Sequence, residues 1–387
     1  MSLHAFALFF SVKLLPLLYA VIGFGALIAI HECGHFLFCK LFGIHTPTFS
    51  IGFGPELYRK QIGKTNFRLA LIPLGGYVEI AGLAEVGQGE QEHAQLTGEG
   101  SFESKPWWQK FFVLSGGILC NLLFAYIIFS ILFMVGSPNQ QQAVMVAGIV
   151  KESAAEKYGL KPGDAIVKIN EQSLLQSDGG VMSGADELLR SVIRKNPNKP
   201  IILGIEREKK AMDLPVTVGV RIEGTEEIGM LGAEFRVPIP QLPFFQALGA
   251  GFMETMRWVG MTFYWIKRLF SQRSLEGAGG PVMIMSMSFG AAQQGLMTLF
   301  TFLALISINL AVLNILPLPV LDGGQIAFVT IEAIIRRKIP LAIRNGIHVA
   351  SWLLLISLAI FLTYRDIATL FGAKFTTLYN KIRGLIK

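Results

Sequence analysis

The sequence predicts a mainly α-helical polytopic membrane protein with four transmembrane helices and an inserted soluble α+β domain. Hydrophobic residues make up 52% of the 387 residues, and the mean hydropathy is +0.51, which is too high for an ordinary soluble protein. Four apolar runs approach the length of about 20 residues that a helix needs to cross a bilayer. Between them, residues 142–236 read as short strands, turns and helices of soluble composition.

The predicted spans divide the chain into loops and domains. We expect the N-terminal segment to be retained, because no cationic region precedes its apolar residues and no clear cleavage site of small residues follows them. The predicted parts are 1–40 for the first span, 41–110 for a loop with a membrane-associated β-hairpin, 111–136 for the second span, 142–236 for the soluble domain, 244–273 for an interfacial amphipathic helix, 297–335 for the third transmembrane segment, 346–365 for the fourth span and 366–387 for an amphipathic tail.

Charge and cysteine content narrow the classes of partner. The net charge of +7 suits a protein that touches anionic lipid. No basic run with interleaved aromatic residues indicates nucleic-acid binding. Cys33, Cys39 and Cys120 all lie in apolar runs, so we expect small buried residues rather than a disulfide framework.

The first span contains His31-Glu32-Cys-Gly-His35, an H-E-x-x-H motif. Residues four apart share one face of a helix, so both imidazoles could hold one metal ion while Glu32 takes a proton from a water held by that metal. The plain alternative is a chance match in a soluble helix. Each charged group at membrane depth costs about 3 kcal/mol or more, so three polar side chains within five residues favour a metal site.

The third span ends in Asn309-Leu-Ala-Val-Leu-Asn314-Ile-Leu-Pro-Leu-Pro-Val-Leu-Asp322-Gly-Gly. Its two prolines break the helix, and irregular backbone at membrane depth is tolerated only where it lines a cavity or packs in protein. Asp-Gly-Gly by itself is usually a turn. With a metal site already predicted in the first span, Asp322 becomes the predicted third ligand.

Two further features stand out near the membrane. Residues 65–80 alternate and end in the pair Gly75-Gly76, which predicts a β-hairpin, and residues 51–55 are predicted to form a turn. In the second span, Asn121 is polar enough at mid-membrane for a functional role to be suspected. The glycines before it are expected to serve helix packing.

The charge of the loops predicts a membrane topology, and the metal site can form only if that topology places all three predicted ligands at a similar depth. The basic loop 336–344 should be cytoplasmic, and with four spans residues 41–110 lie on the same side. All three predicted ligands then fall at a similar depth, and the soluble domain lies outside. If residues 244–270 also crossed, Asp322 would reach the opposite face, so we expect that helix to be interfacial.

The soluble domain resembles a PDZ domain. The resemblance rests on Gly159-Leu-Lys-Pro-Gly-Asp164 before an apolar strand. PDZ domains bind extended peptides by strand addition, so a peptide or a substrate ectodomain is the expected partner. A spacer without a ligand is the alternative.

The chain as a whole resembles the site-2 protease family, and within it the bacterial regulator-of-sigma-E protease branch. The H-E-x-x-H motif, the Gly-Gly-Tyr hairpin, the Ser-Gly-Gly segment before Asn121, the PDZ-like insertion and N-x-x-P-x-P-x-L-D-G-G carry the resemblance. It implies an intramembrane zinc metalloendopeptidase of the bacterial inner membrane that cuts the membrane segments of single-span proteins. An anti-sigma factor or a remnant signal peptide would be a typical substrate. The chain has room for one PDZ module, whereas many members of this branch carry two.

The resemblance also implies roles for individual residues. His31, His35 and Asp322 would bind Zn²⁺, and Glu32 would be the catalytic base. The site would face the cytoplasm and the PDZ-like domain the periplasm. The hairpin would hold the substrate in extended form, and two asparagines would clamp its unwound backbone. The substrate-binding residues implied in this way are Leu69, Leu71, Gly75, Gly76, Tyr77, Asn309 and Asn314.

Two other classes of function stay open at this stage. A metal transporter would also place His and Asp in the membrane, but it leaves Glu32, the hairpin and the PDZ-like domain unexplained. A non-enzymatic membrane scaffold would present the PDZ-like domain and should tolerate Glu32→Gln.

Overall fold

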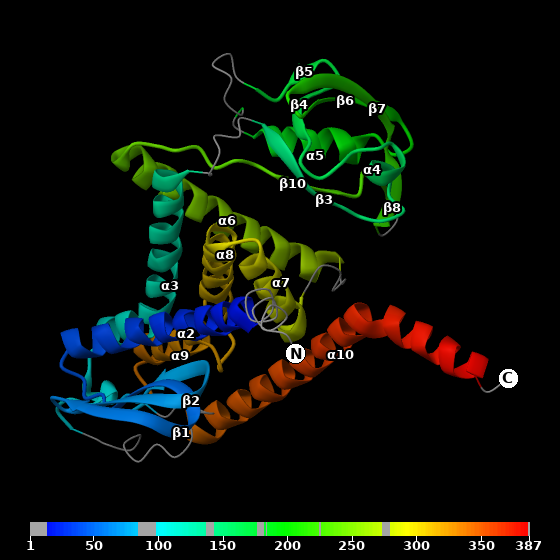
Figure 1. Ribbon diagram of the computed structural model, residues 1–387. Helices are drawn as coiled ribbons and strands as arrows, with labels where there is room; N and C mark the ends of the chain where they lie inside the picture. Colours follow the sequence, from blue (N-terminus) through cyan, green and yellow to red (C-terminus); the bar gives the residue numbers. More distant parts are fainter. Residues whose placement is uncertain are drawn as a thin grey trace, which may run out of the picture. The chain divides into compact units, whose positions relative to one another are not determined.

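The computed structural model describes residues 14–83, 98–136, 143–175, 182, 184–223, 226–272 and 279–385. The chain divides into two compact units, one formed by Met1–Ser130 with Leu248–Lys387 and the other by Ile131–Ala247. The first unit holds the long apolar helices and a small β-sheet, and the second holds most of the strands (Figure 1).

Four helical segments of the described chain are long and apolar enough to cross a membrane. They are Leu15–Leu41 (α2), Trp107–Val135 (α3), Leu296–Asn314 (α8) and Ala342–Leu370, which lies within α10 (Leu341–Leu385). The predicted polytopic membrane class is confirmed. The predicted fourth span and tail form one continuous helix, and the predicted amphipathic face of the tail lies largely outside the described side chains.

Three further helices belong to the first unit. Phe244–Gln272 (α6) forms as a helix and is not among the four candidate spans. Pro281–Gln293 (α7), which the sequence analysis left unassigned, packs against α2, α8 and α10. The third transmembrane segment breaks as its prolines predict: α8 ends at Asn314 and Asp322–Ile335 (α9) begins after an irregular connection. A short 3₁₀ helix, Phe102–Ser104 (η2), precedes α3.

Helices α2 and α3 touch backbone to backbone. A Cβ atom at Gly34 would overlap the carbonyl of Gly116, and one at Gly116 would overlap that of Gly34. Small residues let two helices in lipid approach this closely. Their contact places the middle of α3 directly against the two histidines of α2.

Strands Thr48–Ile62 (β1) and Thr65–Val78 (β2) pair antiparallel and pack along α2. The chain reverses at Gly63 and Lys64, and it also reverses across residues 52–57, because residues 48–51 run parallel to 66–69 whereas residues 58–62 run antiparallel to 65–69. The turn predicted at residues 51–55 therefore coincides with a reversal of the chain, although these residues are counted within β1. Gly52 and Gly54 have φ of +89° and +88°, so they bend the chain at this reversal, where the register shifts.

The pair Gly75-Gly76 does not form the hairpin tip but lets β2 fold back around β1. Ser50 is opposite both Arg68 and Tyr77 in the register, and residues 48–51 therefore lie between residues 66–69 and 76–78. Residues 58–62 pair with the other side of 65–69. The small sheet thus has two outer edges, residues 76–78 and residues 58–62.

The second unit is an α+β domain. Its main sheet has the strand order β10-β3-β4-β6-β7, with β5 on β4 and the pair β8-β9 separate. Buried Ile166, Leu189 and Leu203 are among the residues that form its core. The strand, short helix, turn and strand that the sequence predicts are present. The elements are Val144–Ile149 (β3), Ala154–Lys157 (α4), Ala165–Ile169 (β4), Gln172–Ser173 (β5), Ala185–Lys195 (α5), Pro200–Arg207 (β6), Lys210–Thr217 (β7), Gly219–Glu223 (β8), Glu226–Met230 (β9) and Ala233–Arg236 (β10).

A buried ion pair fixes the turn before β4. Arg207 donates from Nε to Asp164 Oδ1 at 2.6 Å and from Nη2 to Oδ2 at 2.7 Å, and the Lys161 backbone N–H donates to Oδ2 at 2.8 Å. Burial raises the pKa of the Asp164 carboxyl, but the hydrogen bonds and charge of Arg207 together with the Lys161 N–H outweigh it, so the pKa lies below its ordinary value of 3.8.

We predict that Asp164→Asn destabilises the second unit by about 2 kcal/mol at pH 7, because charge-assisted hydrogen bonds of this kind contribute about that much. A depressed folded-state pKa contributes stability above the unfolded-state value, and that stability is lost as the pH falls through the folded-state pKa. The difference between wild type and variant should therefore shrink below pH 3.8. Hydrogen exchange of the β4 and β6 amides in a denaturant series measures it.

Asp213→Asn is the matched control for this prediction. Asp213 accepts from Lys168 Nζ at 2.9 Å, but its side chain is 57% exposed. Exposed ion pairs contribute about 0.5 kcal/mol. An equal loss in both variants would contradict the role given to the buried pair.

Candidate metal centre and active site

The two histidines of the first motif and the aspartate of the last converge in the first unit. His31 and His35 lie one turn apart on α2, both buried, and Asp322 is the first residue of α9. The Nε2 atom of His31 is 3.3 Å from Asp322 Oδ2, the Nε2 atom of His35 is 3.5 Å from Oδ1, and the two Nε2 atoms are 3.2 Å apart. Potential ligand atoms of all three residues lie within 4.8 Å of one another.

The chemistry of this donor set fits a zinc ion. Two imidazole nitrogens and one carboxylate are typical zinc ligands, and three protein ligands leave a coordination position open, as in catalytic sites. Asp322 Oδ2 is buried and has no hydrogen-bond partner among the described residues, which suits a carboxylate oxygen that serves a cation. His35 Nδ1 is 2.8 Å from the carbonyl oxygen of Val113. Because a carbonyl only accepts, Nδ1 carries the proton and Nε2 presents its lone pair to the centre.

Glu32 lies beside the centre and faces the small sheet. Its Oε2 accepts a hydrogen bond from the backbone N–H of Val78 at 3.1 Å. The predicted base is thereby held against the outer sheet edge of residues 76–78. The carboxylate keeps further lone pairs for a proton.

Gly117 on α3 lies directly against both rings. A Cβ atom there would be 2.5 Å from His31 Cε1 and 2.6 Å from both His31 Nδ1 and His35 Nε2. From the sequence alone, this glycine was expected only to serve helix packing. Its place under the histidines follows from the pairing of α2 with α3, which no spacing along the chain reveals.

The structure separates the two asparagines that the resemblance grouped together. Asn314 is buried, and its Nδ2 is 3.5 Å from His31 Nε2. Asn309 is exposed on α8, and its Oδ1 accepts from Thr262 Oγ1 of α6 at 2.8 Å. Five residues correspond to about 140° around a helix, so the two side chains leave on different faces. The structure brings Asn314, but not Asn309, to the centre.

The hairpin residues also divide into two groups. Gly76 and Tyr77 follow Gly75 on the outer edge of the sheet, the same edge whose Val78 N–H donates to Glu32. Leu69 lies in an inner segment, opposite both Ile51 and Tyr58, so its backbone is already within the sheet. Leu71 precedes the bend of β2, and its side chain is 55% exposed.

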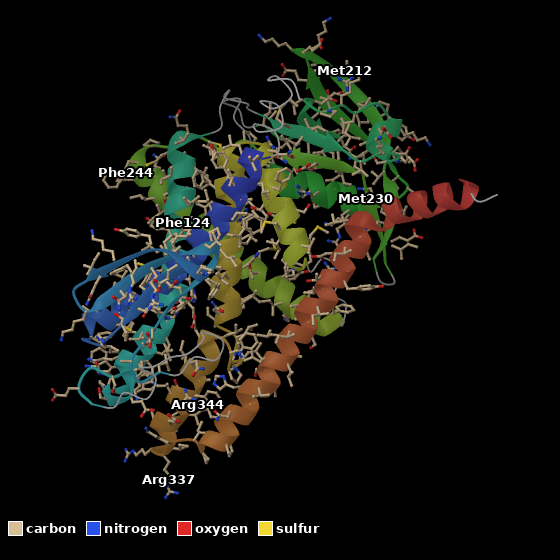
Figure 2. All side chains as sticks on the ribbon, turned by 60° about the horizontal axis from the view of Figure 1, so that its bottom comes forward. Phe124, Met212, Met230, Phe244, Arg337 and Arg344 are labelled. Carbon is tan, nitrogen blue, oxygen red and sulfur yellow. The ribbon has the colours of Figure 1, made fainter. Side chains whose placement is uncertain are left out.

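Gln325 is a residue near the centre that sequence reasoning missed. Its Nε2 is 2.9 Å from the carbonyl oxygen of Pro319 and 3.2 Å from His348 Nε2, and its Oε1 accepts from Arg344 Nη2 at 3.0 Å. It therefore ties the connection before Asp322 to the start of α10, where Figure 2 labels Arg344. A glutamine one turn after a predicted metal ligand, in an otherwise apolar segment, is a signal that could have found it.

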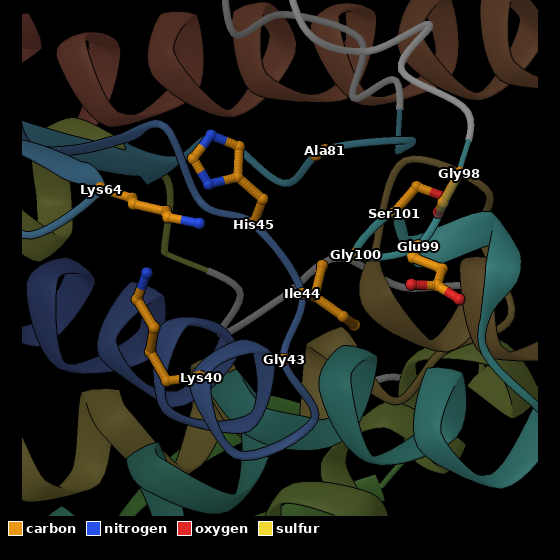
Figure 3. A pocket seen from close by; sticks show the side chains of 10 residues that line it. All are labelled: Lys40, Gly43, Ile44, His45, Lys64, Ala81, Gly98, Glu99, Gly100 and Ser101. Carbon is orange, nitrogen blue, oxygen red and sulfur yellow. The ribbon is translucent and has the colours of Figure 1, made fainter.

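A separate cavity of about 510 Å³ lies elsewhere in the first unit. Its lining includes Lys40, His45, Lys64 and Glu99 and shares no residue with the metal ligands (Figure 3). Lys40 Nζ donates to Thr65 Oγ1 at 2.8 Å and lies 4.9 Å from the Phe36 ring centroid. This cavity is therefore distinct from the candidate metal centre.

We predict that Gly117→Ala lowers bound metal to well below one ion per chain, because its methyl group would displace the imidazoles of His31 and His35. Gly290→Ala on α7, where a Cβ atom meets nothing within 4 Å, is the control. Elemental analysis of both purified variants after dialysis makes the comparison. Full metal content in Gly117→Ala would show that α3 does not lie against the ligands.

Comparison with known proteins identifies the family of the chain. The model of peptidase family M50 matches residues 19–358. A protein of Clostridium perfringens named as a zinc metalloprotease is 32% identical over 353 residues, covering 91% of this chain and 98% of the relative. A protein of Nostoc sp. named in the same way is 33% identical over 361 residues, covering 91% and 96%. A chloroplastic membrane metalloprotease of Arabidopsis thaliana is 32% identical over 359 residues, covering 89% and 77%. The chain therefore belongs to peptidase family M50, the site-2 protease family, and is a zinc-dependent metallopeptidase of the membrane.

Proposed function

We propose that this metallopeptidase hydrolyses peptide bonds within the transmembrane segments of single-span membrane proteins. The convergence of His31, His35 and Asp322 supports this proposal most directly, because the histidines lie within one candidate span and Asp322 follows the break after another. A hydrolytic centre at that depth can only meet substrate segments that enter the bilayer. Typical substrates would be an anti-sigma factor or a remnant signal peptide.

In this mechanism His31, His35 and Asp322 would hold the zinc ion. When bound, zinc supplies Lewis acidity and lowers the pKa of water to about 7. Glu32 takes the proton of the attacking water and returns it to the leaving amide nitrogen, and its hydrogen bond from the Val78 N–H keeps the carboxylate in place for both transfers.

The substrate must unwind before it is cut, because the carbonyls of a helix are engaged in hydrogen bonds. Residues 76–78 can replace those bonds. The Glu79 N–H donates inward to Thr48 at 2.9 Å, whereas the Val78 N–H points outward to Glu32. Backbone groups alternate along a strand, so those of Gly76 also face outward. We propose that an extended substrate pairs there, beside Asn314.

The remaining assignments concern the membrane and the second unit. We propose a bacterial inner-membrane protein whose metal centre faces the cytoplasm, since Arg336, Arg337, Lys338 and Arg344 all lie between α9 and the middle of α10. The second unit would be a periplasmic PDZ-like domain, and α6 an interfacial helix. Among the described strands of the second unit, β10 stands at one end of the main sheet, and we propose that a peptide or substrate ectodomain adds a strand along its outer side.

Glu32→Gln tests the chemistry. We expect cleavage of a purified single-span substrate to fall 10²- to 10⁴-fold, roughly the contribution of a general base, while bound zinc stays at the wild-type level. Glu56→Gln is the control, because Glu56 pairs with Arg68 on the same small sheet. Cleavage that survives in Glu32→Gln would remove the mechanism. If even the wild type neither cut nor held zinc, a transporter or a scaffold would become the better hypothesis.

Cysteine cross-linking tests the sheet edge. In a background without Cys33, Cys39 and Cys120, we expect Tyr77→Cys to form a disulfide with a cysteine near the scissile bond of the substrate. Tyr58→Cys, on the opposite outer edge of the same sheet, should not. Equal cross-linking from both edges would contradict strand addition beside Glu32.

A further inference from the structure

Asn121 is a buried polar residue that the mechanism above does not use. It lies on α3 with 0% exposure, in a candidate membrane span. It follows Gly117 by one turn, so both face the histidines of α2. Its Nδ2 atom is 3.1 Å from His31 Nδ1, and its Oδ1 atom has no hydrogen-bond partner among the described residues.

The backbone of Asn121 is tied to a neighbouring helix. Ser307 on α8 donates from Oγ to the carbonyl oxygen of Asn121 at 2.9 Å, so α3 and α8 are joined at this residue. Burying an unpaired amide in a span is unfavourable by several kcal/mol in hydrocarbon, and a simple packing position would be filled better by leucine. The amide is therefore placed to act on His31.

Which end of the Asn121 amide meets His31 depends on which ring nitrogen of His31 carries the proton. The two ends of a carboxamide have nearly the same shape, and their hydrogen bonds decide the orientation. If the nitrogen donates to Nδ1, the ring proton lies on Nε2 and points into the centre. If the oxygen accepts from Nδ1–H, Nε2 is left with a lone pair. With the nitrogen at Nδ1, the amide oxygen has no hydrogen-bond partner among the described residues, so the tautomer of His31 decides between the two orientations.

We propose that Asn121 is a positioning residue whose carboxamide oxygen accepts a hydrogen bond from His31 Nδ1–H and so holds the His31 Nε2 lone pair toward the centre. This inference rests on the proposed role of His31 as a metal ligand. The carbonyl oxygen of Val113 does the same for His35, at 2.8 Å. Both imidazoles are then held in the same tautomer by acceptors on α3. Partners of this kind contribute about 10- to 100-fold to metal affinity.

Three variants of the full-length protein test the proposal through zinc affinity, measured by competition with a chelator. Asn121→Leu, which keeps the size and removes the acceptor, should weaken zinc binding about 10- to 100-fold. Asn121→Asp places an oxygen at both ends and should bind zinc at least as tightly as the wild type. Ser307→Ala removes the tie between α8 and α3 without touching His31 and should leave zinc affinity within about twofold.

The zinc affinities of the three variants distinguish a positioning role of Asn121 from a packing role. Wild-type affinity in Asn121→Leu would overturn the proposal, and a loss in Ser307→Ala as large as in Asn121→Leu would reduce Asn121 to a packing role. A tenfold loss in Asn121→Asp would show that the amide nitrogen is the group that meets Nδ1. If Asn121→Leu does not fold, the zinc affinity of Asn121→Asp by itself tests the proposal. Zinc affinity does not depend on cleavage, so loss of the proposed proteolysis and loss of this inference are distinguishable.

Discussion

The contact between α2 and α3 at Gly34 and Gly116 is the constraint on which the rest of the centre depends. Because neither glycine has a side chain, the two backbones touch, and the next residue of α3, Gly117, lies against both imidazoles. One turn further on, Asn121 reaches His31 Nδ1. At the other end of the contact, the Val113 carbonyl reaches His35 Nδ1. One face of α3 thus determines how both histidines are turned.

Asp322, the proposed third ligand, reaches the candidate centre through a broken helix rather than a continuous one. Between α8 and α9 the chain bends tightly enough that a Cβ atom at Gly323 would overlap the Ile315 carbonyl and one at Gly324 the Leu318 carbonyl. The bend leaves Asp322 at the start of α9, facing α2. Gln325 then links the same bend to α10 through Arg344 and His348. A polar network of this kind holds its shape in an apolar setting, because each member loses a partner if the bend moves.

The small sheet has outer edge positions where backbone groups can form hydrogen bonds, which the middle of a membrane helix lacks. A helix in lipid has no backbone groups to offer, since all of them are engaged within it. The outer edge at residues 76–78 has such groups, and the Val78 N–H already binds Glu32. Glu32, the proposed base, and this edge are therefore positioned by a single contact. In the proposed function, a substrate strand on this edge would meet Glu32 and the candidate centre together, which would join the unwinding of the substrate to its hydrolysis.

The sequence by itself determined the class of the protein and the chemistry of its centre. Apolar runs of spanning length are local properties, and so is the four-residue spacing that puts His31 and His35 on one helix face. The cost of ionisable groups in lipid made these few polar residues conspicuous, and the two prolines marked the break before Asp322. What depends on contacts between distant segments could not be read in this way. Glycine spacing did not reveal whether Gly75 and Gly76 form a tip or a bend. The five-residue spacing of Asn309 and Asn314 puts them on different helix faces but did not reveal which of them reaches the centre. Only the tertiary structure decided these points, because a side chain's partner across an interface is set by how two helices or strands are paired and turned, and that pairing leaves no periodic signal in either segment alone.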